Sequence, residues 1–147
     1  MLPLAIREAD SLNYILSSWK ASAYDQQSVL AKGNFYALAN LMCAGILDGD
    51  PVLLVATPPD MPDVILGWVC AEATPEAIVL WYANTKAAYR KAGISARLLD
   101  AAVQMCQAEG AGPGRVFAFS GRFDKLMQSK GWTQMSIARA MHLRQDR

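Results

Sequence analysis

One short segment of this chain concentrates residues that could bind an anion. Gly93 lies among four basic residues within 12 positions, which are Lys86, Arg90, Lys91 and Arg97, although the chain as a whole carries 14 Lys and Arg against 13 Asp and Glu. Glycine has no Cβ, so the backbone can approach a ligand closely there. Free amides and the positive dipole end at the start of a helix favour negative charge. The segment therefore predicts a site for a phosphate-bearing ligand.

The same residues also fit a plainer interpretation. A Walker loop would need GxxxxGK[ST], which is missing, and two of the three glycines of GxGxxG are absent. One glycine at a strand–helix junction is common, and Lys or Arg beside a loop usually faces solvent. On local chemistry alone, a phosphate site and a solvated loop both stay open.

Composition limits the kind of protein. With 147 residues, 53% hydrophobic, 18% charged and a net charge of +1, we expect a single folded domain over residues 1–147 and no disordered chain. Near neutrality also argues against a specific nucleic-acid partner. The start of the chain turns charged before an apolar signal region could form, and no apolar stretch is long enough for a membrane span. We therefore expect a cytoplasmic protein with no membrane partner.

Cysteine and histidine usage excludes further chemistry. Cys43, Cys70 and Cys106 are far apart and form no CxxC pair, and His142 is the one histidine of the chain. A disulfide framework and a metal site are therefore not expected. Cys70 and Cys106 fall on apolar faces and are predicted to be small buried hydrophobic residues.

Hydrophobic periodicity predicts the elements that would position the basic segment. A strand is expected at 4–7, followed by helices that begin near Asp10 and Asn34. Apolar runs predict strands at 51–56, 64–73 and 77–83, and 3.6-residue spacing predicts a helix at 94–108. A strand at 115–119, a short helix at 123–130 and a closing strand at 137–143 are expected to follow. The fold class is thus α/β (or α+β), with a mixed sheet and the order β-α-α-β-β-β-α-β-α-β.

Three segments in the right order resemble the GNAT (Gcn5-related N-acetyltransferase) superfamily. Residues 90–99 read RKAGISARLL and are similar to its [QR]-x-x-G-x-[GA] loop and the helix that follows. Residues 65–69 read ILGWV and are similar to its hydrophobic-Gly-aromatic strand, and residues 123–132 read FDKLMQSKGW and are similar to its last helix and exit. The resemblance implies a GNAT-like, mostly antiparallel mixed sheet flanked by helices.

The resemblance also implies a function and a set of binding residues. It implies transfer of an acetyl group from acetyl-CoA to an amine on a small molecule or protein, by direct attack and without a metal; a homodimer is a further expectation. Backbone amides near Ala83 and Thr85 would polarise the thioester carbonyl. The pyrophosphate would be held by the loop, that is by Arg90, Lys91, Ala92, Gly93, Ile94 and Ser95.

Departures from the family pattern bear on catalysis more than on binding. Ser95 stands where Gly or Ala is usual, which still fits sterically. Met127 replaces the Tyr that would protonate the leaving thiolate, Ser120 replaces a frequent Asn, and little chain follows Trp132. A non-catalytic GNAT-like module that binds CoA or a protein is therefore an alternative, and a nucleotide-phosphate binder is a second.

Two side chains are candidates for proton transfer. Glu72 would lie late on the strand paired with the one that leads to the loop, and it is the first choice of general base. Tyr82 would lie on the loop-bound strand itself, as a base relay or a replacement acid. Each also has a structural interpretation, Glu72 as a solvated carboxylate near a turn and Tyr82 as a packing residue.

Overall fold

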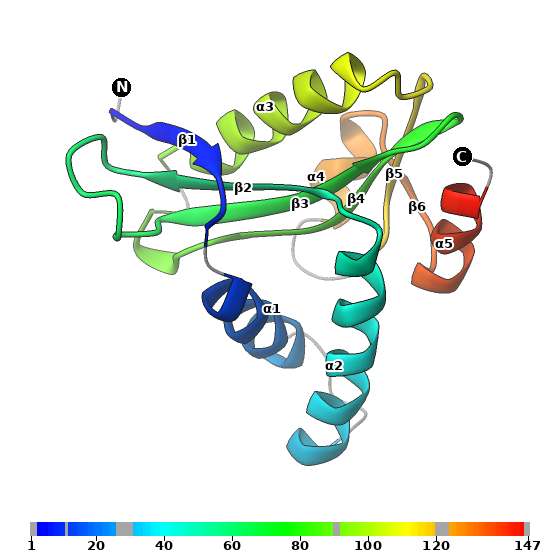
Figure 1. Ribbon diagram of the computed structural model, residues 1–147, viewed down its shortest axis with the longest axis horizontal. Coiled ribbons are helices and arrows are strands. Elements are labelled where there is room, and N and C mark those ends of the chain that lie inside the picture. Colours follow the sequence, from blue (N-terminus) through cyan, green and yellow to red (C-terminus); the bar gives the residue numbers. More distant parts are fainter. Residues whose placement is uncertain (1–2, 11, 26–30, 90–91, 120–123, 146–147) are drawn as a thin grey trace.

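The computed structural model describes residues 3–10, 12–25, 31–89, 92–119 and 124–145. Its strands form one mixed sheet in the order β1-β2-β3-β4-β5-β6 (Figure 1). Neighbours from β1 to β4 pair antiparallel, whereas β4, β5 and β6 pair parallel. The strands are β1 (Ala5–Glu8), β2 (Val52–Thr57), β3 (Gly67–Ala73), β4 (Ala77–Thr85), β5 (Gly114–Phe117) and β6 (Thr133–Gln134).

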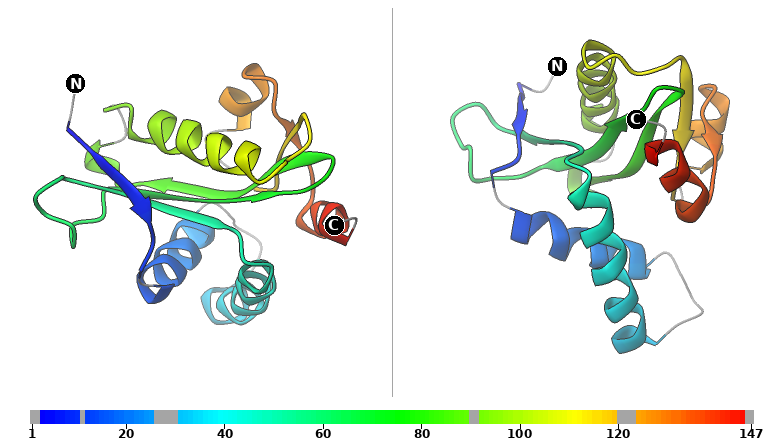
Figure 2. Two further views of the ribbon diagram at one scale, coloured as in Figure 1. Left: turned by 45° about the horizontal axis from the view of Figure 1, so that its top comes forward. Right: turned by 45° about the vertical axis from the view of Figure 1, so that its right-hand side comes forward.

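Helices cover both faces of this sheet (Figure 2). The α-helices are α1 (Leu12–Asp25), α2 (Lys32–Asp48), α3 (Ile94–Ala108), α4 (Asp124–Ser129) and α5 (Ile137–Gln145), and a short 3₁₀ turn, η1 (Ala87–Tyr89), precedes α3. One core cluster joins the sheet to α3 and α4, and the other joins it to α1, α2 and α5. The sheet is therefore buried on both faces, which explains why its central strands read as continuous apolar runs. No helix in the described ranges is long and apolar enough to cross a bilayer.

The expected α/β class, mixed sheet and antiparallel 64–73/77–83 hairpin are confirmed, with β3 starting at Gly67. The second helix begins at Lys32, so Asn34 lies inside its first turn and is not its cap. Asp10 precedes α1, and its carboxylate accepts a 3.2 Å hydrogen bond from Arg7 Nη1.

The expected closing strand at 137–143 is wrong. This segment is α5, and the last strand of the described chain is the two-residue β6 before it. Ser136 Oγ accepts from the amide of Arg139, which satisfies one free amide of the first helical turn. Ile137 and Met141, four residues apart, pack with buried Ala140 on the α1/α2 side of the sheet. The same short apolar sequence fits both periods, and packing selects the helix; His142 accordingly lies exposed on α5.

A β-bulge in β4 sets the orientation of the following residues. Cys70 pairs with Tyr82 while Ala71 pairs with Leu80, so Trp81 is an extra residue in the ladder. Strand residues normally alternate between faces, but the inserted residue places Trp81 and Tyr82 together on the α1/α2 side. Beyond the bulge Ala83 packs on the α3 side of the sheet.

Candidate functional site

The candidate site lies where β4 and β5 part. Among the described residues their pairing ends at Leu80 and Phe117, followed by a 3.0 Å hydrogen bond from the Ala118 amide to the Leu80 carbonyl. Strand β4 nevertheless continues to Thr85. Two cavities open at this point, one on each face of the sheet, and Phe119 lines both of them. The two cavities therefore lie on opposite faces of one stretch of β4 that is not paired with β5.

The first cavity, called here the α3 cavity, has a volume of about 200 Å³ and opens at the start of α3. Gly93 is the N-cap of α3 and adopts a left-handed conformation with φ of 76°. A Cβ built at this position would meet nothing within 4 Å, so the space beside it is open. The first amides of an α-helix have no partner within the helix. Because Gly93, Ser95 and Ala96 line the cavity, its mouth suits an anionic group.

A hydroxyl pair holds this helix start against the sheet. Thr85 Oγ1 and Ser95 Oγ are 2.6 Å apart, and the Thr85 side chain is buried at the end of β4. Ile94 is fully buried in the core, whereas Ala92 is exposed. Of the predicted binding residues, Ala83, Gly93 and Ser95 thus line the cavity, and Ile94 and Thr85 anchor it. Arg90 and Lys91 lie outside the described residues, as does Ser120.

The second cavity, called here the aromatic cavity, has a volume of about 510 Å³ and lies on the α1/α2 side. Tyr82 stands in its wall, with its ring centroid 5.6 Å from that of Trp19 and 5.4 Å from that of Phe119. The Tyr82 hydroxyl lies 2.8 Å from Ser22 Oγ, on α1. The structure therefore brings Tyr82 to the place where the two strands part, as a candidate proton-transfer residue would need.

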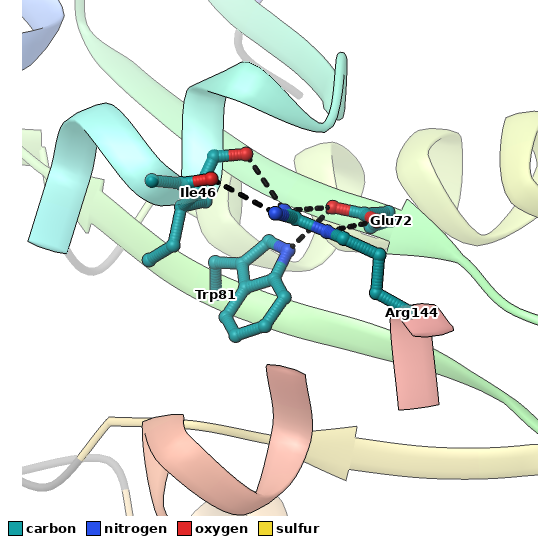
Figure 3. A network of polar contacts seen from close by, with 5 residues as sticks. Ile46, Glu72, Trp81 and Arg144 are labelled. Atoms are coloured by element: carbon teal, nitrogen blue, oxygen red, sulfur yellow. Dashed lines mark hydrogen bonds and ion pairs between the residues drawn. The ribbon is translucent and has the colours of Figure 1, made fainter. Parts of the chain in front are cut away.

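Glu72 occupies a different environment, a buried ion pair with Arg144 of α5 (Figure 3). Its side chain is 2% exposed. Arg144 Nη2 donates to Glu72 Oε1 at 2.6 Å, and Arg144 Nε donates to Oε2 at 2.7 Å. Trp81 Nε1 donates to the same Oε1 at 3.1 Å. Because both carboxylate oxygens accept charge-assisted bonds, this geometry argues against Glu72 as the proton acceptor expected from the sequence.

Arg144 connects the C-terminal helix to two further parts of the fold. Its guanidinium donates to the carbonyls of Gly45 and Ile46 in the last turn of α2, at 2.8 and 2.7 Å, and lies 5.4 Å from the centroid of the Trp81 ring. The last carbonyls of a helix lack partners within the helix, so Arg144 caps α2 from outside. A Cβ on Gly49 would overlap this guanidinium, so Arg144 would have to shift to accommodate one. Trp81 lines the aromatic cavity, so the pair supports the cavity wall from behind.

Sequence reasoning did not single out Phe119, which lines both cavities, or Arg144, which holds Glu72. Phe119 reads as an ordinary strand residue, because nothing local marks the parting of the strands. Arg144 lies 72 positions from Glu72, and no spacing rule connects residues that far apart.

The three cysteines are all buried and free, as expected for Cys70 and Cys106. Burial raises the pKa of the Cys43 thiol to about 11, although nearby Lys20 opposes the shift. It raises the pKa of Cys106 to about 12 and that of Cys70 well above its usual range. Because the thiolate is the reactive form, these residues are poor nucleophiles.

We expect no thiol to react with Ellman's reagent at pH 8 in the folded protein, and all three to react in guanidinium chloride. Because folding raises these pKa values above 9.0, the folded state holds the thiol protons more tightly than the unfolded state does. The full stability of the fold is therefore present below about pH 9, and the free energy of unfolding should fall as pH rises toward 11–12. The fall should be less steep in Cys43→Ala. Rapid labelling of the folded chain at pH 8 would contradict the structure.

The geometry can be compared with known proteins. No protein-family model matches this sequence, and no curated protein sequence matches it either. Among solved structures, a candidate acetyl transferase from Pyrococcus furiosus has a TM-score of 0.73 at 15% identity, over 90% of this chain and 95% of that one. Aminoglycoside N-acetyltransferase AAC(6')-Iy in complex with CoA reaches 0.54 at 16% identity, over 90% of each chain.

A third similar structure is glucosamine-6-phosphate N-acetyltransferase from Arabidopsis thaliana, with a TM-score of 0.54 at 10% identity, over 90% of this chain and 93% of that one. Together these likenesses show that the chain has the GNAT fold. The fold expected from the three sequence segments is thereby confirmed.

Proposed function

We propose that this chain is an acetyl-CoA-dependent N-acetyltransferase that acts on an amine. The observation that carries the proposal is the parting of β4 and β5 at the bulge, with a cavity at a helix start on one face and an aromatic cavity on the other. Two substrates can therefore approach the same strand edge from opposite sides. A cytoplasmic location, where acetyl-CoA is available, is part of the proposal.

The α3 cavity fits the phosphate-bearing arm of CoA. Gly93 leaves open space beside the first amides of α3, where the pyrophosphate would accept hydrogen bonds. Lys130, exposed after α4, lines the same cavity and adds a positive charge. Leu80, Ala83 and Leu99 provide the apolar wall along which the uncharged part of the arm would lie. Arg90, Lys91 and Ala92 are proposed to complete the anion site.

Acetyl-CoA supplies an acetyl group activated as a thioester. The amides near Ala83 and Thr85, on the part of β4 beyond its pairing with β5, would donate to the carbonyl oxygen as charge develops on it. The amine attacks from the aromatic cavity: the new C–N bond forms, the C–S bond breaks, and the sulfur leaves with the electron pair. The amine loses one proton, and the leaving thiolate takes up one.

Tyr82 is proposed as the proton relay of this exchange, because its side chain lines the aromatic cavity and its hydroxyl pairs with Ser22. We expect Tyr82→Phe to lower kcat by about 10²-fold, the lower end of general acid–base contributions, with unchanged acetyl-CoA affinity. Steady-state CoA release and calorimetric titration measure the two effects. Ser22→Ala removes the hydroxyl partner and keeps the Tyr82 side chain, so it should lower kcat less than Tyr82→Phe does. An unchanged kcat in Tyr82→Phe would assign Tyr82 to packing.

One feature favours a second function, a CoA-binding module without catalysis. Met127 is 6% exposed and lines the α3 cavity, and a thioether has no proton to give a leaving thiolate. Calorimetry with acetyl-CoA and ATP, followed by a CoA-release assay with a panel of amines, separates the possibilities. Binding of acetyl-CoA with turnover supports the enzyme, and binding without turnover supports the module. Tighter binding of ATP than of acetyl-CoA would support a nucleotide-phosphate binder.

A further inference from the structure

We infer, on the basis of the proposed function, that the acceptor is a primary amine carried on a compact aromatic or aliphatic body. The reason is the chemistry of the aromatic cavity, which is apolar over most of its wall and contains no charged side chain among its described lining residues. The apolar part of the wall is made by Trp19, Ala23, Phe35, Met42, Trp81, Tyr82, Ala118, Phe119, Met135 and Ile137.

The volume of this cavity is also informative. At about 510 Å³ it lies within the range of cavities that bury small organic ligands. Its wall combines residues from α1, α2, β4 and the start of α5, so an apolar body inside would be enclosed from several sides. Burial of that body removes apolar surface from water, which is the favourable contribution such a wall can offer.

The polar side chains among the described lining residues are neutral, and three of them, Tyr82, Gln134 and Ser136, have hydrogen-bond partners in the protein. The Tyr82 hydroxyl pairs with Ser22, and Gln134 Nε2 donates to the carbonyl of Phe119 at 3.0 Å. Ser136 Oγ accepts from the amide of Arg139 at 3.2 Å. A sugar or a polyamine would lose its many hydrogen bonds to water here and find few replacements. Such acceptors are therefore disfavoured.

Charged residues near the cavity are engaged at its edge. Asp124 Oδ2 accepts from Nε2 of Gln134, a lining residue, at 3.4 Å, so this carboxylate contacts the cavity wall through that side-chain amide. Lys20, one residue after Trp19 on α1, donates to Asn40 at 2.8 Å and lies 5.8 Å from the centroid of the Tyr36 ring. An acceptor with several ammonium groups would need carboxylates that the described wall does not offer.

The same wall favours the reactive form of a single amine. An amine near pKa 10.4 is mostly charged in neutral water and must lose a proton before it attacks. Transfer to an apolar cavity whose described lining offers no carboxylate disfavours the ammonium form and lowers the pKa of the bound amine. The cavity thus helps to deprotonate the amine, which fits with Glu72 being held by Arg144.

The test compares acceptors in the full-length protein. CoA release is measured with 2-phenylethylamine, tryptamine, spermidine, glucosamine 6-phosphate and an aminoglycoside. We expect kcat/KM for the two aromatic amines to exceed that for the polar acceptors at least tenfold. In parallel, tryptophan fluorescence is titrated with 2-phenylethylamine, spermidine and glucosamine 6-phosphate in the absence of acetyl-CoA, since Trp19 and Trp81 line the cavity. Saturable quenching by 2-phenylethylamine alone is the expected result.

Failure of this inference is distinguishable from failure of the proposed function. Turnover of a polar acceptor in preference to 2-phenylethylamine would overturn the inference and leave the acetyltransferase standing. Absence of acetyl-CoA binding would overturn the proposed function, and the fluorescence titration would then decide the inference alone. Quenching by 2-phenylethylamine but not by spermidine supports it. No quenching by 2-phenylethylamine overturns it, whatever the turnover of other acceptors.

A matched pair of variants locates the effect. Met42 lines the aromatic cavity, whereas the adjacent Leu41 is 75% exposed on the same helix. Met42→Glu should lower kcat/KM for 2-phenylethylamine at least tenfold and shift preference toward spermidine, and Leu41→Glu should change neither. Calorimetric affinity for acetyl-CoA reports whether Met42→Glu is folded. The apolar variant Met42→Leu should keep the parent turnover of the aromatic amine. Equal effects of the two Glu variants would contradict the location.

Discussion

Gly93→Asn is expected to weaken acetyl-CoA binding by about 10- to 100-fold, as loss of one or two hydrogen bonds to a charged group predicts. Asparagine tolerates the left-handed conformation better than most residues, so the backbone turn at φ of 76° should persist. Its side chain, however, fills the open space beside the first amides of α3 and blocks the approach of a pyrophosphate. Isothermal titration calorimetry with acetyl-CoA measures the loss.

The control for this variant lies at the other end of the same helix. Gly110 follows α3, also has a positive φ, of 89°, and would also have no neighbour within 4 Å of an added Cβ. Gly110→Asn therefore imposes similar backbone strain far from the α3 cavity, with a stability cost of about 1 kcal/mol at most. It should leave acetyl-CoA affinity unchanged. Equal loss of affinity in both variants, or none in Gly93→Asn, would remove the start of α3 from the binding site.

Arg144→Met is expected to destabilise the fold by about 3–5 kcal/mol, the cost of leaving one charge of a buried pair without its partner. The variant also removes the donors to the Gly45 and Ile46 carbonyls at the end of α2. Equilibrium unfolding in urea measures the change. The double variant Glu72→Gln/Arg144→Met should recover part of the loss, because no buried charge is then left alone, and the double-mutant cycle gives the coupling energy.

An exposed ion pair provides the comparison. Arg7 and Asp10 are paired at 3.2 Å, with side chains 34% and 79% exposed. Asp10→Asn should therefore cost under about 1 kcal/mol. If Arg144→Met were no more destabilising than Asp10→Asn, the Glu72–Arg144 pair would not hold α5 against the sheet in solution.

Glu72→Gln separates the structural role of Glu72 from the catalytic role expected from the sequence. The amide oxygen can still accept from Trp81 and Arg144. For the fraction of protein that is folded, kcat should then stay within a few-fold of the parent value. A general base would instead lose about 10²- to 10⁴-fold. CoA release is measured at a temperature where circular dichroism shows the variant to be folded, and a loss of that size would restore Glu72 as the base.

The sequence by itself determined the class of fold and the place of the helix start. Apolar residues at helical spacing, such as Ile94 and Leu98, predict α3 because side chains three to four positions apart share one helix face. The break at Gly93 predicts the start of that helix, since glycine adopts the left-handed conformation found there more readily than other residues. These features depend on residues close together in the chain, so a single sequence contains them.

Only the tertiary structure decided how the site is assembled. Strict alternation would place Trp81 and Tyr82 on opposite faces, and the bulge against β3 places them on one. The sequence makes Glu72 the first choice of general base, whereas a residue 72 positions away engages both its oxygens. The apolar residues of 137–143 predict a strand, but packing against the α1/α2 side makes the segment a helix. Register shifts, long-range ion pairs and the choice between two periods depend on which surfaces meet, and that free energy exists only once the chain has folded.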